Sequence, residues 1–196
     1  MEKHRVLWNI EPKEVFRYFE DLTQIPRESG KERQVTDYLI AFAENHGLEW
    51  FRDEALNVLI TKKASPGYED RPGVILQGHT DMVCEKNENT AHDFDKDPIT
   101  LVVDGDKITA ADTTLGADDG IGIALALALL VDENAAHPFL EVLCTSDEER
   151  GMYGAEAFDT SLLKGRILIN LDSNEEDIFT VGCAGGPGVR TEIPLV

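Results

Sequence analysis

Histidine and acidic side chains gather in four short segments: QGHTDMV (77–83), LGADDGIG (115–122), TSDEERG (145–151) and NLDS (170–173). The candidate functional residues in them are His79, Asp81, Asp118, Asp119, Glu148, Glu149 and Asp172. One histidine with several carboxylates is a ligand set that suits zinc or manganese and contains too little sulfur for a structural zinc site. This set favours a catalytic metal site, with zinc as the better fit.

The spacing within two of the segments indicates separate roles for their side chains. Asp81 lies two positions after His79, so its carboxylate can accept the second ring N–H and fix the tautomer of a metal-binding histidine. Glu148 and Glu149 are adjacent and point in different directions. One of them can bind metal while the other takes a proton from the metal's water.

Each segment also has a plainer interpretation. The Asp118-Asp119 pair on a glycine-flanked loop can supply a ligand that bridges two ions, but it can also form a turn and an N-cap for the following helix. Residues 147–150 fit a solvated charged loop, and residues 172–174 fit a cap and turn. The coincidence of four such clusters at the ends of expected elements favours the metal site.

The elements that must position these residues alternate between helices and strands. Helical patterns cover residues 12–25, 30–46, 122–130 and 154–158, and strand patterns cover 57–63, 73–77, 139–144 and 167–171, with a hairpin over 99–109 that turns at Asp104-Gly105. The alternation predicts an α/β fold, a three-layer αβα sandwich around a mostly parallel mixed sheet. Residues 74–76 are continuously apolar, which indicates a central strand.

Three of the four segments directly follow a predicted core strand, and the fourth precedes a predicted helix. Open α/β sheets bind their ligands at the carboxyl ends of the strands. We therefore expect His79, Asp118, Glu149 and Asp172 to converge at one rim of the sheet.

Composition limits the possible partners. The chain has 38 Asp and Glu against 18 Lys and Arg, a formal net charge of −20, so we expect no nucleic acid and no acidic membrane surface as a partner. Its longest apolar run, 121–131, is too short to span a membrane, and no secretory signal opens it, so a cytoplasmic location is expected. Cys84, Cys144 and Cys183 are expected to be reduced structural thiols.

In order and spacing, the four segments resemble the motifs of the co-catalytic zinc peptidases that include carboxypeptidase G and the aminoacylases. The motif sequences are most similar to those of the aminoacyl-histidine dipeptidases of the peptidase D type, and the resemblance runs from about residue 5 to residue 196. It implies hydrolysis of small dipeptides, with Xaa-His dipeptides as the expected substrates, by metal-activated water.

The resemblance also implies a role for each residue. Two Zn²⁺ ions are expected, with Mn²⁺ or Co²⁺ as alternatives. His79 and Asp172 would hold one ion, Glu149 would belong to the second, and Asp118 would bridge them. Asp81 would orient His79, and Glu148 would be the general base. A cis peptide bond is implied between Asp118 and Asp119.

Family members are considerably longer than this chain. The resemblance therefore implies that residues 1–186 are the amino-terminal part of the catalytic domain and that residues 187–196 begin a lid and dimerisation domain, through which the intact enzyme would form a homodimer. A metal-binding fragment without catalytic activity is the alternative expectation. An acidic interaction module, in which the motifs are only turns and caps, is a third.

Overall fold

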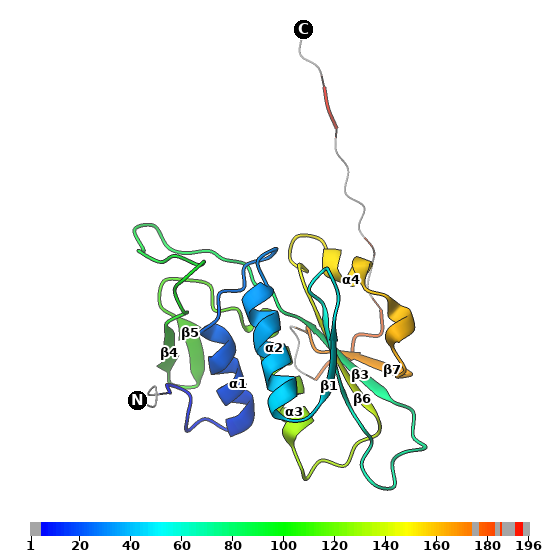
Figure 1. The fold of residues 1–196 in the computed structure, drawn as a ribbon. Coiled ribbons are helices and arrows are strands. Elements are labelled where there is room, and N and C mark those ends of the chain that lie inside the picture. The colour runs from blue at the N-terminus through cyan, green and yellow to red at the C-terminus, as the bar shows by residue number, and fades with distance from the viewer. Residues whose placement is uncertain (1–4, 174–176, 183–184, 186–190, 194–196) are drawn as a thin grey trace.

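A five-stranded sheet forms the centre of the chain in this computed structural model, which describes residues 5–173, 177–182, 185 and 191–193 (Figure 1). The strands lie in the spatial order β1 (Glu49–Arg52), β2 (Val58–Lys62), β6 (Leu140–Thr145), β3 (Val74–His79) and β7 (Ile167–Asn170). β6, β3 and β7 are parallel, whereas β2 is antiparallel to both β1 and β6. The expected α/β fold around a mixed sheet is confirmed, and its parallel part is the part that carries the candidate site.

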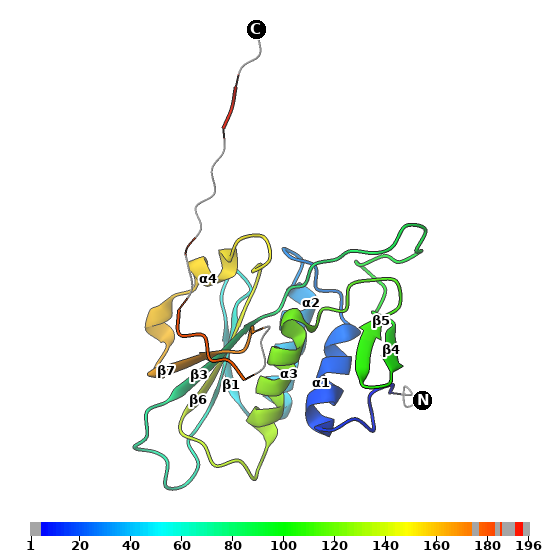
Figure 2. The ribbon, with the colours of Figure 1, turned by 180° about the vertical axis from the view of Figure 1, so that it is seen from behind.

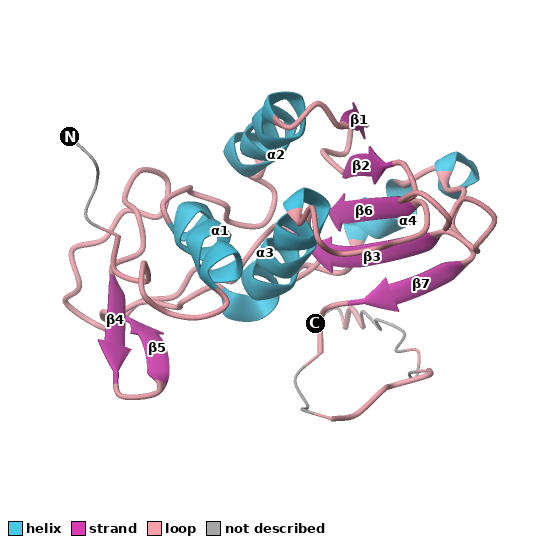
Figure 3. Cartoon of the chain, turned by 90° about the horizontal axis from the view of Figure 1, so that it is seen from below, coloured by secondary structure: helices cyan, strands magenta, loops and turns pink. Residues whose placement is uncertain are grey.

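Helices cover both faces of the sheet. On one face lie α2 (Arg33–Asn45) and α3 (Ala117–Val131), with α1 (Lys13–Thr23) packed against α3 (Figures 1 and 2). A two-stranded hairpin of β4 (Leu101–Asp104) and β5 (Lys107–Ala110) lies beside α1. The opposite face carries the short helix α4 (Tyr153–Ala157) and a 3-10 turn at Thr160–Leu162 (Figure 3).

β3 is an interior strand covered on both faces, as its continuous apolar run predicted. Leu76 faces the larger core, which β3 shares with the three long helices. Ile75 faces the opposite way, into a smaller cluster with Leu59, Leu143 and Phe158. Because successive side chains of a strand point to opposite faces, a strand covered on both sides is apolar at every position.

Some element boundaries differ from the sequence-based expectation. α2 begins at Arg33 rather than at residue 30, because Gly30 has a φ of 82° and cannot belong to a right-handed helix. The hairpin strands end at Asp104 and resume at Lys107, so the turn is Gly105-Asp106, one residue later than expected. β1 was not predicted. Its residues are mostly exposed, which leaves no clear apolar pattern.

β7 is an edge strand rather than the core strand that its composition predicted. Ile167, Leu168 and Ile169 are 47%, 55% and 42% exposed. Among the described strands, β7 pairs with β3 alone. An apolar run identifies a strand, but it does not show which neighbours cover it.

The expected domain boundary between residues 186 and 187 and the third cysteine, Cys183, lie outside the described residues. Within the described chain, Cys84 and Cys144 are free thiols. None of the helices in that part of the chain is long and apolar enough to cross a membrane.

Candidate metal centre

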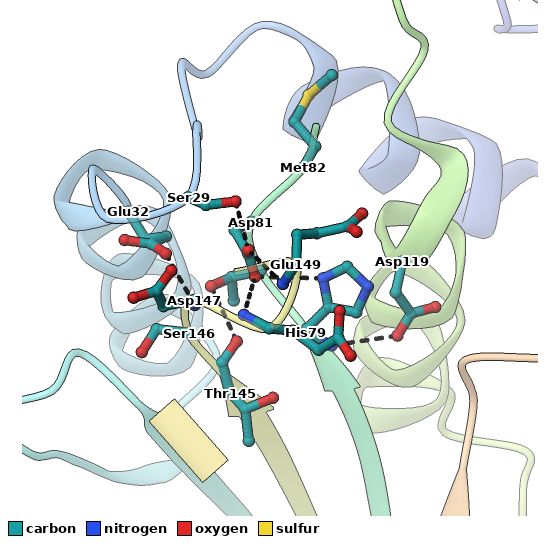
Figure 4. Close-up of polar contacts among 12 residues, drawn as sticks. Ser29, Glu32, His79, Asp81, Met82, Asp119, Thr145, Ser146, Asp147 and Glu149 are labelled. Atoms are coloured by element: carbon teal, nitrogen blue, oxygen red, sulfur yellow. Dashed lines mark hydrogen bonds and ion pairs between the residues drawn. The ribbon is translucent and has the colours of Figure 1, made fainter. Parts of the chain in front are cut away.

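The candidate residues lie at one edge of the sheet because three parallel strands end there. His79 is the last residue of β3 and pairs in register with Thr145, the last residue of β6. β7 ends at Asn170, two residues before Asp172. Glu149 follows the end of β6 by four residues, and Figure 4 shows it beside His79.

The Asp118-Asp119 pair lies at the amino-terminal end of α3, where the backbone is not helical. Gly116 has a φ of 73°, and both aspartates have non-helical dihedral angles. The peptide bond between them is cis, as the family resemblance implied. The two side chains reach different parts of His79. Asp118 contacts the ring. Asp119 accepts the backbone N–H of His79 at 3.2 Å (Figure 4).

The ring of His79 lies between carboxylates on both sides. Its Nδ1 is 3.3 Å from Oδ1 of Asp81, and its Nε2 is 2.8 Å from Oδ1 of Asp118 and 3.9 Å from Oδ2 of Asp172. Burial alone would lower the pKa of this imidazole, but the hydrogen bonds to Asp81 and Asp118 reverse the effect and raise it to about 9.

Two groups of ligand-type side chains share His79. One contains His79, Asp118 and Asp172, and the other contains His79, Glu148 and Glu149; within each, the ligand atoms lie within 4.8 Å of one another. A histidine nitrogen with carboxylate oxygens is a donor set that suits zinc, manganese or cobalt. The residues present therefore fit a divalent metal ion.

Glu149 falls into a group with Glu148 rather than with Asp118. Among the described residues, no group of three contains both Asp118 and Glu149. The structure thus brings all four expected ligands to one rim, while the bridging role of Asp118 stays a prediction.

In a third acidic group, Glu32 with Asp81 and Asp147, each carboxylate accepts hydrogen bonds from protein donors. Oε1 of Glu32 accepts the backbone N–H groups of Gly30 and Asp147 at 2.9 and 2.8 Å. This group is a hydrogen-bonded support beneath the loop that follows β6.

Asp81 connects more of the site than the sequence indicated. Besides contacting His79, its Oδ1 accepts the backbone N–H of Glu148 at 3.0 Å. Its Oδ2 accepts the backbone N–H of Glu149 at 3.2 Å and the hydroxyl of Ser29 at 2.7 Å. Burial opposes ionisation of Asp81, but these donors outweigh it and lower the pKa to about 2. One ionised carboxylate therefore holds both the histidine and the diglutamate loop.

Four acidic groups at the rim, those of Asp119, Glu148, Glu149 and Asp172, have raised pKa values. Burial is the main cause for Glu148, Glu149 and Asp172, and neighbouring carboxylates add to it while His79 opposes it. Burial likewise raises the pKa of Asp119 to about 7. Concentrated negative charge of this kind is relieved when a cation binds.

Sequence reasoning missed the residues that support the site from a distance. Ser29 and Glu32 come from the connection between α1 and α2, and neither belongs to a recognisable motif. Asn57, which is fully buried, accepts the backbone N–H of Ser146 at 3.1 Å and donates to the carbonyl of Gly154 at 2.8 Å. No local pattern could have identified these residues, because their partners are far away in the sequence.

The fold is that of known peptidases. A solved tripeptidase from Staphylococcus aureus matches 85% of this chain with a TM-score of 0.71 at 24% sequence identity, and the match covers 44% of that protein. At this identity the likeness concerns the fold alone. No family model matches the chain.

Two dipeptidases are similar in sequence as well. The cytosol non-specific dipeptidase of Escherichia coli is 47% identical over 189 residues, which are 96% of this chain and 39% of that protein. The aminoacylhistidine dipeptidase of Vibrio alginolyticus is 44% identical, with a TM-score of 0.85, over 88% of this chain and 35% of that one. The chain belongs to the peptidase family of these dipeptidases and spans well under half of their length.

Proposed function

We propose that this site binds divalent metal ions, zinc in the first place, and hydrolyses the peptide bond of dipeptides. The observation that carries the proposal is the group of His79, Asp118 and Asp172, whose ligand atoms lie within 4.8 Å of one another. The family relationship supports dipeptides as the substrate class, because both relatives are named dipeptidases.

In this proposal His79 and Asp172 hold one ion, Asp118 is shared, and Glu149 belongs to a second ion. Bound metal would supply a water molecule of lowered pKa and polarise the scissile carbonyl. The chain's own contribution is to fix the donors. Asp81 would orient the imidazole through Nδ1, and Nε2, which faces Asp118, would be the nitrogen that binds the ion.

Glu148 is the proposed general base. Its backbone N–H is held by Asp81 at 3.0 Å, so the start of its side chain is fixed next to His79. Burial and the nearby Asp172 raise the pKa of Glu148, which brings this carboxylate closer to the operating pH that favours proton transfer. It would take the proton from the attacking water and pass it to the leaving amine.

Aminoacyl-histidine dipeptides are the proposed preferred substrates. The name of the Vibrio relative supports this choice, while the name of the Escherichia coli relative supports a wider range. We further propose a cytoplasmic location, a catalytic domain that includes residues 1–186, and a homodimer of the whole protein without nucleic acid or membrane partners. The cytosolic relative and the net charge of −20 support the location and the excluded partners.

A second candidate function is metal binding by these 196 residues without turnover. The two ligand groups share one histidine, so the second group has only Glu148 and Glu149 of its own among the described residues. Misplaced reacting groups can cost about 100-fold in rate. We therefore expect little dipeptidase activity from this chain by itself.

The test combines metal content with hydrolysis. The purified chain is loaded with zinc, its metal content is measured by mass spectrometry, and release of amino acids from β-alanyl-histidine and from alanyl-alanine is followed. His79→Ala should lose metal, whereas Glu148→Gln should keep metal and lose any turnover. Glu156→Gln on α4 is the matched control and should change neither. A wild-type chain that retains no metal would overturn the proposal, and metal without turnover would favour the second candidate.

A further inference from the structure

Arg27 lies between two of the segments that supply candidate ligands. Its Nη1 donates to the carbonyl oxygens of Thr80 and Asp81, at 3.0 and 3.1 Å, just after the end of β3. Its Nη2 donates to the carbonyl oxygen of Gly116, just before the start of α3. One guanidinium group thus ties the loop after β3 to the loop before α3.

The surroundings of this guanidinium leave no space for another side chain. Arg27 is buried. A Cβ atom built at Gly116 or at Gly120 would come too close to Nη2 of Arg27. These two glycines flank the Asp118-Asp119 pair on either side, so the guanidinium contacts both ends of the segment that carries Asp118.

The other end of Arg27 is fixed to the loop after β3. Its carbonyl oxygen accepts the backbone N–H of Met82 at 3.1 Å, and Glu28 forms a bridge with Met82. Ser29 adds its hydroxyl bond to Asp81 (Figure 4). The backbone at residues 27–29 is thus held on the loop after β3. The Arg27 guanidinium extends from there to the loop before α3.

A buried cation is a costly way to fill this space. Burial lowers the pKa of Arg27 to about 10, so the group stays charged at neutral pH. Within the described residues, its guanidinium makes three hydrogen bonds, all to backbone carbonyls, and Nε is buried without a partner. An apolar side chain of similar size would avoid the desolvation cost. What the guanidinium supplies instead is a fixed spacing between two loops.

We propose that Arg27 is a positioning residue that sets the distance between His79 and Asp118 and so determines the geometry of the metal site. This inference rests on the proposed metal binding by His79, Asp118 and Asp172. The planar guanidinium carries donors in several fixed directions, whereas a lysine ammonium is a single point of charge and cannot span the same carbonyls.

The test measures binding and spectrum of Co²⁺, whose visible absorption reports the arrangement of its ligands. Arg27→Lys and Arg27→Met should each weaken Co²⁺ affinity about 10- to 100-fold, the usual effect of losing a support of a metal ligand, and should alter the absorption bands. Arg52→Lys is the matched control, because Arg52 is a partly buried arginine that bonds Asp37 on α2. Its affinity and spectrum should equal those of the wild type.

Circular dichroism of each variant separates the outcomes. Folded Arg27 variants with wild-type affinity and spectrum would overturn the positioning role. Two Arg27 variants that fail to fold while Arg52→Lys folds would overturn it as well, in favour of a purely structural role. A wild-type chain that binds no Co²⁺ would overturn the metal site itself, which distinguishes that failure from a failure of the role of Arg27.

Discussion

Nε2 of His79 lies 2.8 Å from Oδ1 of Asp118. A contact this short between a ring nitrogen and a carboxylate oxygen is a hydrogen bond, which needs a proton between the two atoms. The opposite ring nitrogen faces a second carboxylate, that of Asp81, which explains why the imidazole is held in its charged form. Since the same two atoms are proposed metal ligands, proton and metal ion compete for one position.

Metal binding should therefore release a proton from His79. The pKa of His79 is raised to about 9, so the ring is protonated at pH 7 and must lose its proton to bind an ion. The apparent affinity should rise about tenfold per pH unit toward pH 9 and then level off. Calorimetric titration at pH 7 in two buffers of different ionisation enthalpy should report about one proton released per ion.

The same titration of His46→Ala is the control, because the ring of His46 bonds the carbonyl of Phe42 and packs against the Phe42 ring at the end of α2. It should release the same number of protons as the wild type. An affinity that does not change between pH 6 and pH 8 would show that no protonated histidine lies at the site.

Asp81→Asn should weaken metal binding although it preserves size. Both oxygens of Asp81 accept bonds, Oδ1 from His79 and Glu148 and Oδ2 from Ser29 and Glu149. An amide presents N–H in place of one oxygen, so one pair of donors would face another donor. We expect a loss of metal affinity of about 10- to 100-fold, measured by competition with a chelating dye.

Glu20→Gln is the control for this substitution. Glu20 is also a buried carboxylate that accepts two backbone N–H groups, those of Val6 and Leu7, but it lies on α1. It should lose stability without losing metal affinity. Equal metal affinities of the Asp81→Asn variant and the wild type would show that Asp81 does not support metal binding.

The residues at the rim of the sheet could be predicted from the sequence, because each is marked by a pattern within one short segment. A carboxylate or histidine directly after an apolar strand run is visible in a single segment, and parallel strands place such segments at one edge. His79 and Asp172 were predicted in this way from β3 and β7. The position of Asp118 at the same rim was predicted from its place before a helix and from the family motifs, whereas its direct contact with the ring of His79 was not predicted.

The supports of the site could not be predicted, since each joins segments far apart in the chain. Arg27 contacts Gly116, and Ser29 contacts Asp81, yet an arginine and a serine between two helices have no distinctive pattern. The exposure of β7 was missed for a related reason. Composition reports that a strand is apolar, but only the assembled sheet shows that its outer edge has no described neighbour.

Zinc should stabilise the folded chain against heat. An ion that binds only the folded state adds about 2.7 kcal/mol at a concentration of 100 times its dissociation constant. The midpoint of thermal unfolding should rise with added zinc and return to its starting value with a chelator. Asp118→Asn should remove this response, whereas Asp112→Asn, an exposed aspartate that bonds Asn87, should keep it. An identical zinc response in both variants would contradict the proposed ligand.

Gly78→Ala should destabilise the chain through Asp119. A Cβ atom at Gly78 would overlap the Asp119 carboxylate, which is buried and accepts the backbone N–H of His79 at 3.2 Å. Because the carboxylate also lies close against Gly122 on α3, we expect a loss of about 1–3 kcal/mol in the free energy of unfolding, measured with urea. Gly182→Ala is the control, since nothing lies within 4 Å of a Cβ atom there, and it should change stability by less than about 0.5 kcal/mol. Equal stability of the two variants would mean that Asp119 can leave its position freely, and the close fit between β3 and α3 would then not hold the site together.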